Sequence, residues 1–378
     1  MPAGGLIKYD YLTPGGFYKQ MWDWDGFFIG MHLATRSEEN VKYLKWWALN
    51  FLHTMDEEGY VCGCISQKEL RQLSGKFSMK PFLAQGCYYA SVYSGEFEWI
   101  RPIYDKMKKV IAYREKTQFD EKYGLFFWEN AMHSGADNNP AISNEEDDRN
   151  AILACDMNTF QLREYVCMAK ICSELGFTDD EQLYKKKVEN LNRAINKQLW
   201  FAESDSFFNI RRDTGKPVRR ISYSNFLPLV NTLASVTNGK RMIKRYLWNS
   251  DHMLSDFGIR TLSKQDKDYN NENTIIPYSN WQGPVWPIAN FLYSVALKNY
   301  GFKQEAKHLA HTISTLCLDD IRECGSMHEN YHAETGEPLA PAAEHSPDGI
   351  FRGIIGWNLL VQNMLEGAYN GKGALLSI

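Results

Sequence analysis

The stretch SEENVKYLKWWALNFLHT, residues 37–54, shows the pattern that the rest of the chain follows. Ser37 is a suitable helix N-cap, and the two glutamates after it suit the positive N-terminal end of a helix. Apolar residues then recur three and four positions apart, as on the buried face of a helix. They are Val41, Leu44, Trp47, Ala48 and Phe51. The stretch therefore predicts an amphipathic helix that ends near Thr54.

The same periodicity recurs along the chain and predicts helices in pairs, with short connections inside each pair and long connections between pairs. The expected helices are a segment ending near 33 and the segments 37–54, 80–94, 97–117, 158–175, 179–199, 225–236, 239–248, 286–299, 303–317 and 350–366. The turn sequence Asp213-Thr214-Gly215 predicts a short β-hairpin within 203–224. We therefore expect an all-α fold in a single domain over residues 1–378, most simply a barrel of paired helices with long loops over one mouth.

Composition narrows the classes of function. The net charge of the 378 residues is −4, so no broad basic field favours nucleic-acid binding. Eleven Trp and 21 Tyr are more than core packing usually requires. Their flat apolar faces and polar edges suit sugar rings, although any single one is more simply placed in the core. A small carbohydrate is therefore a better candidate partner than a nucleic acid.

The sequence also bears on location. The opening MPAGGLIKYDYL lacks the apolar centre of a signal peptide. No run of the chain reaches the roughly 18 apolar residues that a membrane span needs. Eight cysteines are scattered at positions 62, 64, 87, 155, 167, 172, 317 and 324. We interpret them as reduced thiols of a cytoplasmic protein that does not enter a membrane.

A second stretch, GSMHENYHAETGEPLAP at 325–341, carries the chemistry and admits two interpretations. Taken literally, His328-Glu329-x-x-His332 is the zinc-peptidase pattern, which requires a helix so that both imidazoles reach one ion. The glycines and prolines around it oppose a helix. We therefore expect an extended segment followed by a turn, with Glu329 as a catalytic carboxylate.

Four segments combine aromatic and polar residues and fall mostly in expected loops, as in a ligand cleft. They are 22–28, 126–140, 280–290 and 327–338. Asp137 lies in one of them, in a sequence whose turn chemistry alone favours a turn aspartate that caps a backbone N–H. Paired with Glu329, Asp137 becomes a candidate acid for glycosidic cleavage, which needs one carboxyl group on each side of the bond. The acidic run at 145–148 is interpreted as a solvated loop rather than a calcium site.

These segments resemble glycoside hydrolase family 63. The run SGADN at 134–138 is similar to the family's S-G-x-D-N. ENY at 329–331 with ETG at 334–336 is similar to its E-N-Y…x-T-G, and WQGPVWP at 281–287 to its W-R-G-P-V-W. CDMN at 155–158 and WDGFF at 24–28 are similar to its D-L-N and W-D-S-x-F segments.

The resemblance implies an (α/α)6 barrel that hydrolyses α-glycosides with inversion and without a cofactor. It assigns the general acid to Asp137 and the general base to Glu329. The expected substrate contacts are Trp24, Asp25, Trp128, Asn138, Trp281, Gln282, Trp286, His328 and Trp357. Glucosides, mannosides and glycosylglycerates are substrate classes of the family. Gln282 stands where the family has Arg, so the sugar stays open.

Three other classes of function stay open. A zinc metallopeptidase would use His328 and His332. A sugar epimerase on a similar helical barrel would need a histidine pair acting on a ring-opened sugar, and a sugar-binding protein would bind without turnover.

An acidic aglycone would require a cation at the mouth of the barrel. The candidates for that cation are Arg211, Arg212, Arg219, Arg220 and Lys19. The oligomeric state is also open.

Overall fold

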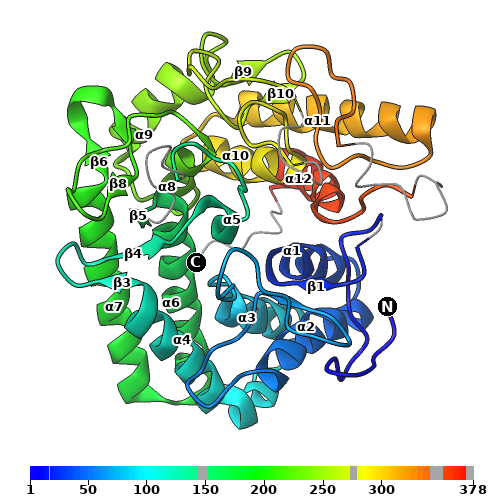
Figure 1. Cartoon of the computed structure of the whole chain (residues 1–378), viewed down its shortest axis with the longest axis vertical. Coiled ribbons are helices and arrows are strands. Elements are labelled where there is room, and N and C mark those ends of the chain that lie inside the picture. Colours follow the sequence, from blue (N-terminus) through cyan, green and yellow to red (C-terminus); the bar gives the residue numbers. More distant parts are fainter. Residues whose placement is uncertain (17, 143–150, 273–278, 341–351, 372–378) are drawn as a thin grey trace.

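The computed structural model describes residues 1–16, 18–142, 151–272, 279–340 and 352–371. Six helices form a closed inner ring, in which each helix packs against the next and the last returns to the first (Figure 1). They are α1 (Asp23–Ala34), α3 (Leu83–Ser94), α6 (Cys155–Leu175), α8 (Leu227–Val230), α10 (Pro287–Asn299) and α12 (Leu360–Asn370). The expected all-α barrel is therefore confirmed.

An outer layer of helices covers this ring. Within the described ranges, the outer helices are α2 (Val41–His53), α4 (Tyr104–Gln118), α7 (Thr178–Gln198), α9 (Val236–Met242) and α11 (Lys303–Cys324). Burial separates the two layers: every residue of α1 except Leu33 is buried, whereas α7 buries only Tyr184, Leu191 and Ile195. A helix that is buried on all sides belongs inside, and a helix with one apolar stripe belongs at the surface.

Several helix boundaries differ from the expected ones for local reasons. The helix expected at 97–117 starts as a 3₁₀ turn, η2 (Glu98–Ile103), because Pro102 has no backbone N–H to donate. In the segment expected at 225–236, α8 has only 4 residues, and Thr232 (φ 55°) lies in the left-handed region, which a helix cannot continue through.

Three other expected helices begin or end elsewhere. Ser37 makes no side-chain cap, and a 3₁₀ turn, η1 (Glu38–Asn40), comes before α2. α11 continues beyond 317 to Cys324, where Gly325 (φ 81°) ends it in the left-handed conformation. α12 follows the 3₁₀ turn η6 (Trp357–Leu359) and so begins later than 350.

The strands are short and antiparallel. The largest sheet has the order β3 (Phe119–Asp120), β4 (Leu125–Trp128), β5 (Ile152–Leu153) and β8 (Ile210–Arg211). Pairs are also formed by β1 (Met21–Trp22) with β2 (Cys64–Ile65), by β6 (Trp200–Phe201) with β7 (Ser206–Phe207), and by β9 (Leu254–Ser255) with β10 (Gly258–Ile259). The hairpin expected within 203–224 is present: Ile210 bridges to Pro217, and the N–H of Gly215 donates to the carbonyl of Arg211 at 2.8 Å.

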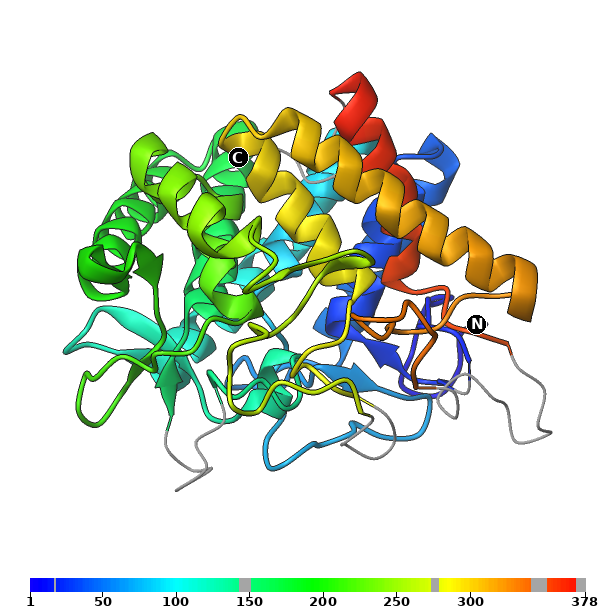
Figure 2. The ribbon, with the colours of Figure 1, turned by 90° about the horizontal axis from the view of Figure 1, so that it is seen from above.

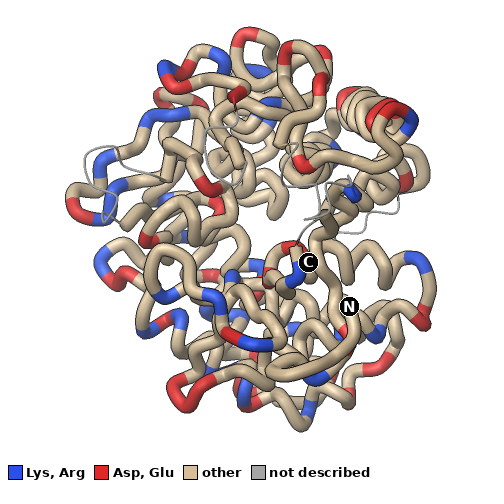
Figure 3. The backbone as a smooth tube through the Cα atoms, turned by 45° about the vertical axis from the view of Figure 1, so that its right-hand side comes forward, with Lys and Arg blue, Asp and Glu red and all other residues tan. Residues whose placement is uncertain are grey.

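The long connections lie at one end of the helices (Figure 2). Each inner helix from α3 onward is preceded by a long segment and followed by a short link to its outer partner, or, for α12, by the end of the described chain. All six inner helices therefore begin at the same end, which is the end where loop residues gather. Lys and Arg are interspersed with Asp and Glu over the described backbone (Figure 3). Among the described residues, no helix is both long and apolar enough to cross a membrane.

The contact between α1, α2 and α3 yields a test of the packing. Trp47 of α2 fits between two glycines: a Cβ built on Gly26 or on Gly86 would lie 2.5 Å from an atom of the indole. We expect Gly86→Ala to lower the free energy of unfolding by about 1–3 kcal/mol through overpacking. This loss should occur although Ala favours helix over Gly by about 1 kcal/mol.

Urea unfolding of Gly86→Ala in the wild-type and Trp47→Phe backgrounds measures the effect. Phe lacks the second ring, so the cost of Gly86→Ala should disappear or reverse in that background. An equal cost in both backgrounds would contradict the packing described here.

Candidate active site

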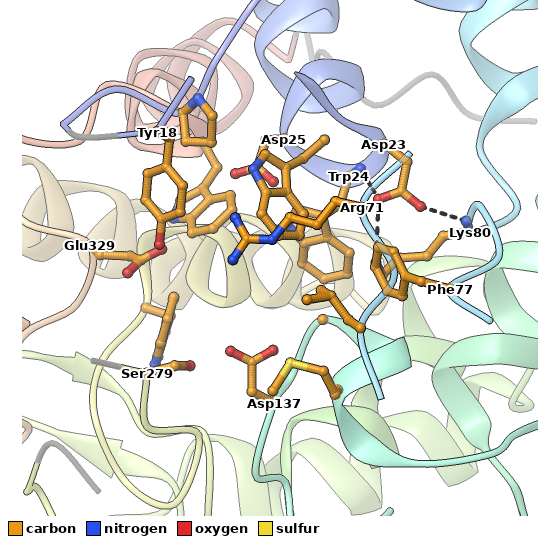
Figure 4. A pocket seen from close by; sticks show the side chains of 17 residues that line it. Tyr18, Asp23, Trp24, Asp25, Arg71, Phe77, Lys80, Asp137, Ser279 and Glu329 are labelled. Atoms are coloured by element: carbon orange, nitrogen blue, oxygen red, sulfur yellow. Dashed lines mark hydrogen bonds and ion pairs between the residues drawn. The ribbon is translucent and has the colours of Figure 1, made fainter. Parts of the chain in front are cut away.

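A cavity of about 300 Å³ opens among the long loops, above the beginnings of the inner helices. Six of the residues expected from the sequence line it: Trp24, Asp25, Asp137, Trp286, Glu329 and Trp357. Lining residues that sequence reasoning did not select include Tyr18, Trp22, Asp23, Arg71, Lys80 and Ser279. Figure 4 shows Asp25, Asp137 and Glu329 projecting into this space from different elements.

Asp137 follows a short helix whose ends are capped by other residues. The side chain of Asn130 accepts from the N–H of His133 at 3.0 Å at the start of α5 (Ala131–Ser134). The side chains of Ser134 and Asn139 each accept a backbone N–H of the following turn, at 3.0 Å. Among the described residues, the side chains of Asn130, Ser134 and Asn139 thus cap this helix and turn. The carboxyl group of Asp137 faces the cavity.

The environment of Asp137 favours its protonated form. Burial raises the pKa of Asp137 to about 6, and the nearby Ser279 hydroxyl and Lys80 ammonium oppose that rise. A carboxyl group that still holds its proton near neutral pH can act as a proton donor.

Asp25 lies beside a buried ion pair at the start of α1. Asp23 accepts from the backbone N–H of Lys80 at 2.6 Å and from its ammonium at 3.3 Å, and both side chains are at most 2% exposed. Burial, followed by the charge of Asp23, raises the pKa of Asp25 to about 8, although the charge of Lys80 opposes the rise. The raised pKa favours the protonated form of Asp25, which can donate a hydrogen bond as well as accept one.

Glu329 lies on an extended segment rather than a helix. The backbone of Tyr331 exchanges two hydrogen bonds with Val285, at 2.8 and 2.9 Å, which places the segment beside the start of α10. Glu329 is 7% exposed and lines the cavity. The extended conformation agrees with the expectation from the glycines and prolines.

The zinc-peptidase geometry is absent from this described segment. His332 Nδ1 accepts from the N–H groups of Glu334 and Thr335 at 3.1 and 3.2 Å, and so caps the turn that follows. His328 Nδ1 instead contacts Asp320 at 3.0 Å. The two imidazoles therefore have different partners and do not share one face of a helix.

One group in the described part of the chain has metal-ligand types close together. Ligand atoms of Asp320, Cys324 and His328 lie within 4.8 Å of one another. The carboxylate oxygens of Asp320 already accept hydrogen bonds from His328 and from the Tyr331 hydroxyl. That arrangement satisfies the carboxylate without an ion. The acidic run at 145–148 lies outside the described residues.

Indole rings form one wall of the cavity. Trp286 lies 6.0 Å from Trp357, and Trp357 lies 6.5 Å from Trp24, measured between ring centroids. Trp281 stacks behind Trp286 at 4.4 Å, and it is only 1% exposed. Among the described atoms, Nε1 of Trp22 and Nε1 of Trp357 are buried without a hydrogen-bond partner. The cavity thus offers apolar faces together with unused donors, as a polyhydroxylated ligand requires.

The other expected contact residues do not line the cavity. Trp128 donates through Nε1 to Asp156 at 3.0 Å, at the start of α6. Asn138 accepts from the N–H of Trp281 at 2.6 Å, and the Gln282 amide donates to the Asn138 carbonyl at 3.1 Å. Trp281 and His328 likewise contact other residues, Trp286 and Asp320 respectively.

Comparison with known families and curated proteins indicates glycoside hydrolases. Residues 18–348 match the family described as mannosylglycerate hydrolase MGH1-like glycoside hydrolase domain. The chain is 22% identical over 153 residues to a mannosylglycerate hydrolase of Rubrobacter radiotolerans, covering 40% of the chain and 33% of that protein. It is 22% identical over 282 residues to the mannosyl-oligosaccharide glucosidase GCS1 of Arabidopsis thaliana, covering 58% of the chain and 32% of that protein. These matches span about a third of the length of either curated relative.

Solved structures share the fold. The GH63 mannosylglycerate hydrolase from Thermus thermophilus, solved with glucose, superposes with a TM-score of 0.74 at 14% identity and covers 96% of each chain. The neutral trehalase from Saccharomyces cerevisiae superposes with a TM-score of 0.68 at 13% identity, covering 95% of this chain and 73% of that one.

The geometry of the 325–340 segment generates a prediction about metal. Because His328 and His332 face different partners, the purified protein should carry no stoichiometric zinc, and His332→Ala should not change its metal content. Elemental analysis of dialysed protein checks this. About one zinc ion per chain, lost in both His328→Ala and His332→Ala, would restore the peptidase pattern.

Proposed function

Because the chain belongs to the mannosylglycerate hydrolase MGH1-like family of glycoside hydrolase domains, we propose that it hydrolyses an α-linked glucoside or mannoside with inversion of the anomeric configuration. Asp137 is the general acid and Glu329 the general base. The observation that carries the proposal is that these two carboxyl groups line one cavity walled by indole rings. The closed inner ring supports a single catalytic domain over residues 1–378.

The two carboxyl groups divide the chemistry between them. Asp137 protonates the leaving oxygen, and its raised pKa supports that role. Glu329 takes a proton from a water that attacks the anomeric carbon from the opposite face. Inversion needs room for this water, so the two carboxyl groups should be about 6.5–9.5 Å apart in the substrate complex.

The remaining lining residues suit a sugar ring. The faces of Trp24, Trp286 and Trp357 provide an apolar surface, and neutral Asp25 can donate to a hydroxyl. No cofactor takes part. The family membership and the extended segment around Glu329 favour this hydrolase over a zinc peptidase, and the family favours it over an epimerase or a sugar-binding protein.

An acidic aglycone of the glycerate type is the second part of the proposal. Arg71 lines the cavity from the loop before α3, at its exposed rim. Backbone hydrogen bonding to Cys64 at 2.9 Å fixes its main chain, and its guanidinium lies 5.8 Å from the Trp22 ring. Figure 4 shows the side chain reaching into the cavity. A planar guanidinium is well suited to bind a carboxylate.

The cations chosen from the sequence do not line the cavity. Each of the four arginines has an acidic partner, and Lys19 is exposed. Arg211 pairs with Asp213, Arg212 with Asp120, Arg219 with Glu203, and Arg220 with Asp266 and Asp268. Arg71 is therefore the better candidate.

We also propose a cytoplasmic location, which the eight unpaired cysteines support.

Variants of the two carboxyl groups test the mechanism. Asp137→Asn and Glu329→Gln should each lower kcat on an unactivated glycoside by about 10²–10⁴-fold, because each removes a proton-transfer group. An aryl glycoside with a good leaving group needs less protonation, so it should rescue Asp137→Asn far more than Glu329→Gln. Steady-state kinetics on both substrates would contradict the assignment if Glu329→Gln kept nearly wild-type turnover.

The raised pKa of Asp137 sets a pH limit. Only the protonated form can donate, so kcat/KM should fall as pH rises through a pKa of about 6 and then decline about tenfold per pH unit. A pH series on an unactivated glycoside measures this. Asp137→Asn assayed on the aryl glycoside is the control, and its kcat/KM should not show this fall with rising pH. A flat profile to pH 9 in the wild type would exclude Asp137 as the acid.

Substitution of Arg71 tests the aglycone. Arg71→Met should raise KM for a glycosylglycerate by about 10–100-fold, since a hydrogen bond to a charged group is worth about 1.5–3 kcal/mol. The neutral glycosylglycerol should be unaffected. Arg212→Met, which changes an arginine outside the cavity, is the matched control. Equal KM changes on both substrates would reject the acidic aglycone without touching the hydrolytic mechanism.

A further inference from the structure

A buried carboxylate near the end of α11 contacts the segment that carries Glu329. Asp320 is 3% exposed. Its carboxylate accepts from the backbone N–H of His328 at 2.7 Å, from His328 Nδ1 at 3.0 Å and from the Tyr331 hydroxyl at 2.7 Å. The Asp320 carboxylate therefore accepts hydrogen bonds from residues on either side of Glu329, His328 and Tyr331.

Two more contacts fix the same segment. The side-chain amide of Asn358 donates to the carbonyl of His328 at 2.7 Å. The backbone of Tyr331 pairs with Val285. The residue before Glu329 and the residue two positions after it are therefore both held, while the Glu329 side chain lies at the cavity. Among these contacts, Asp320 provides the charged group. Its side chain contacts both His328 and Tyr331.

The charge of Asp320 is stabilised by the same contacts. Burial favours its neutral form, but hydrogen bonds from His328 and Tyr331 hold the pKa of Asp320 below its usual value. Asp320 is thus a carboxylate at neutral pH and accepts from every one of these donors. Asn at this position would replace one acceptor oxygen with an NH2 group, which would face the hydrogen-bond donors of His328 and Tyr331.

We propose that Asp320 is a positioning residue for Glu329, holding His328 and Tyr331 so that the Glu329 carboxylate keeps its aim at the attacking water. The inference rests on the proposed function, in which Glu329 is the base. Water activation depends on geometry, and a shift of about 1 Å can cost about 10²-fold in rate. Asp320 itself does not touch the substrate cavity.

Asp320→Asn is the direct test. It should lower kcat by about 10–100-fold with little change in KM. Because the defect lies with the base, the aryl glycoside should not rescue it, in contrast to Asp137→Asn. The matched control is Asp319→Asn on the same helix, where an exposed carboxylate pairs with Arg322 at 2.7 Å, and it should behave as wild type. If Asp320→Asn folds poorly, Tyr331→Phe removes one donor to Asp320 and should show a smaller defect of the same kind.

A double variant separates positioning from general stability. In the Glu329→Gln background, Asp320→Asn should change kcat by no more than about twofold, because the group it positions is already lost. A full additional loss there, rescue by the aryl glycoside, or wild-type kcat in Asp320→Asn while Glu329→Gln is inactive would overturn this inference alone. Nearly wild-type turnover by Glu329→Gln would overturn the proposed function and this inference with it.

Discussion

Closure of the inner ring between its first and last helices is the contact on which the site depends. His32 of α1 and Asn363 of α12, 331 positions apart, share a buried hydrogen bond of 2.6 Å. Arg36 pairs with Glu366 one turn further along, at 2.6 Å. Because all inner helices begin at the same end, this closure also brings Trp24 beside Trp357 at the mouth. The cavity is thus a consequence of ring closure and helix direction rather than of any single loop.

Different surroundings give the carboxyl groups of the cavity different protonation states. Asp23 forms a buried ion pair with Lys80. Asp25 lies next to that pair and titrates near 8, and Asp137 titrates near 6. A site walled by aromatic rings, in which two carboxyl groups have raised pKa values, offers both hydrogen-bond donors and acceptors near neutral pH. The extended segment of Glu329 adds a further carboxyl group, fixed from behind by α11.

Sequence periodicity predicted most of the fold because burial in a two-layer barrel imposes it directly: Val41, Leu44 and Trp47 repeat at helical spacing and are all buried. It failed where backbone chemistry intervened, as at Pro102, or where a polar stretch continued a helix, as in α11. Asp137 and Glu329 could be selected because they lie in loop segments beside aromatic residues, and the resemblance to glycoside hydrolase family 63 assigned their roles. Arg71 and Lys80 could not, since their approach to the cavity depends on how the loop before α3 folds over the mouth. The supporting roles of Trp128, Asn138 and Gln282 likewise depend on partners far away in the sequence.

The central claim is that Asp137 and Glu329 act on opposite faces of an α-glycosidic bond in a single displacement. The stereochemistry of the first product tests it most directly. Proton NMR of the wild-type reaction on an α-glycoside, recorded before mutarotation equilibrates the released sugar, identifies the anomer that forms first. The account predicts that the β anomer appears first. Initial release of the α anomer would mean retention through a covalent intermediate and would contradict the account.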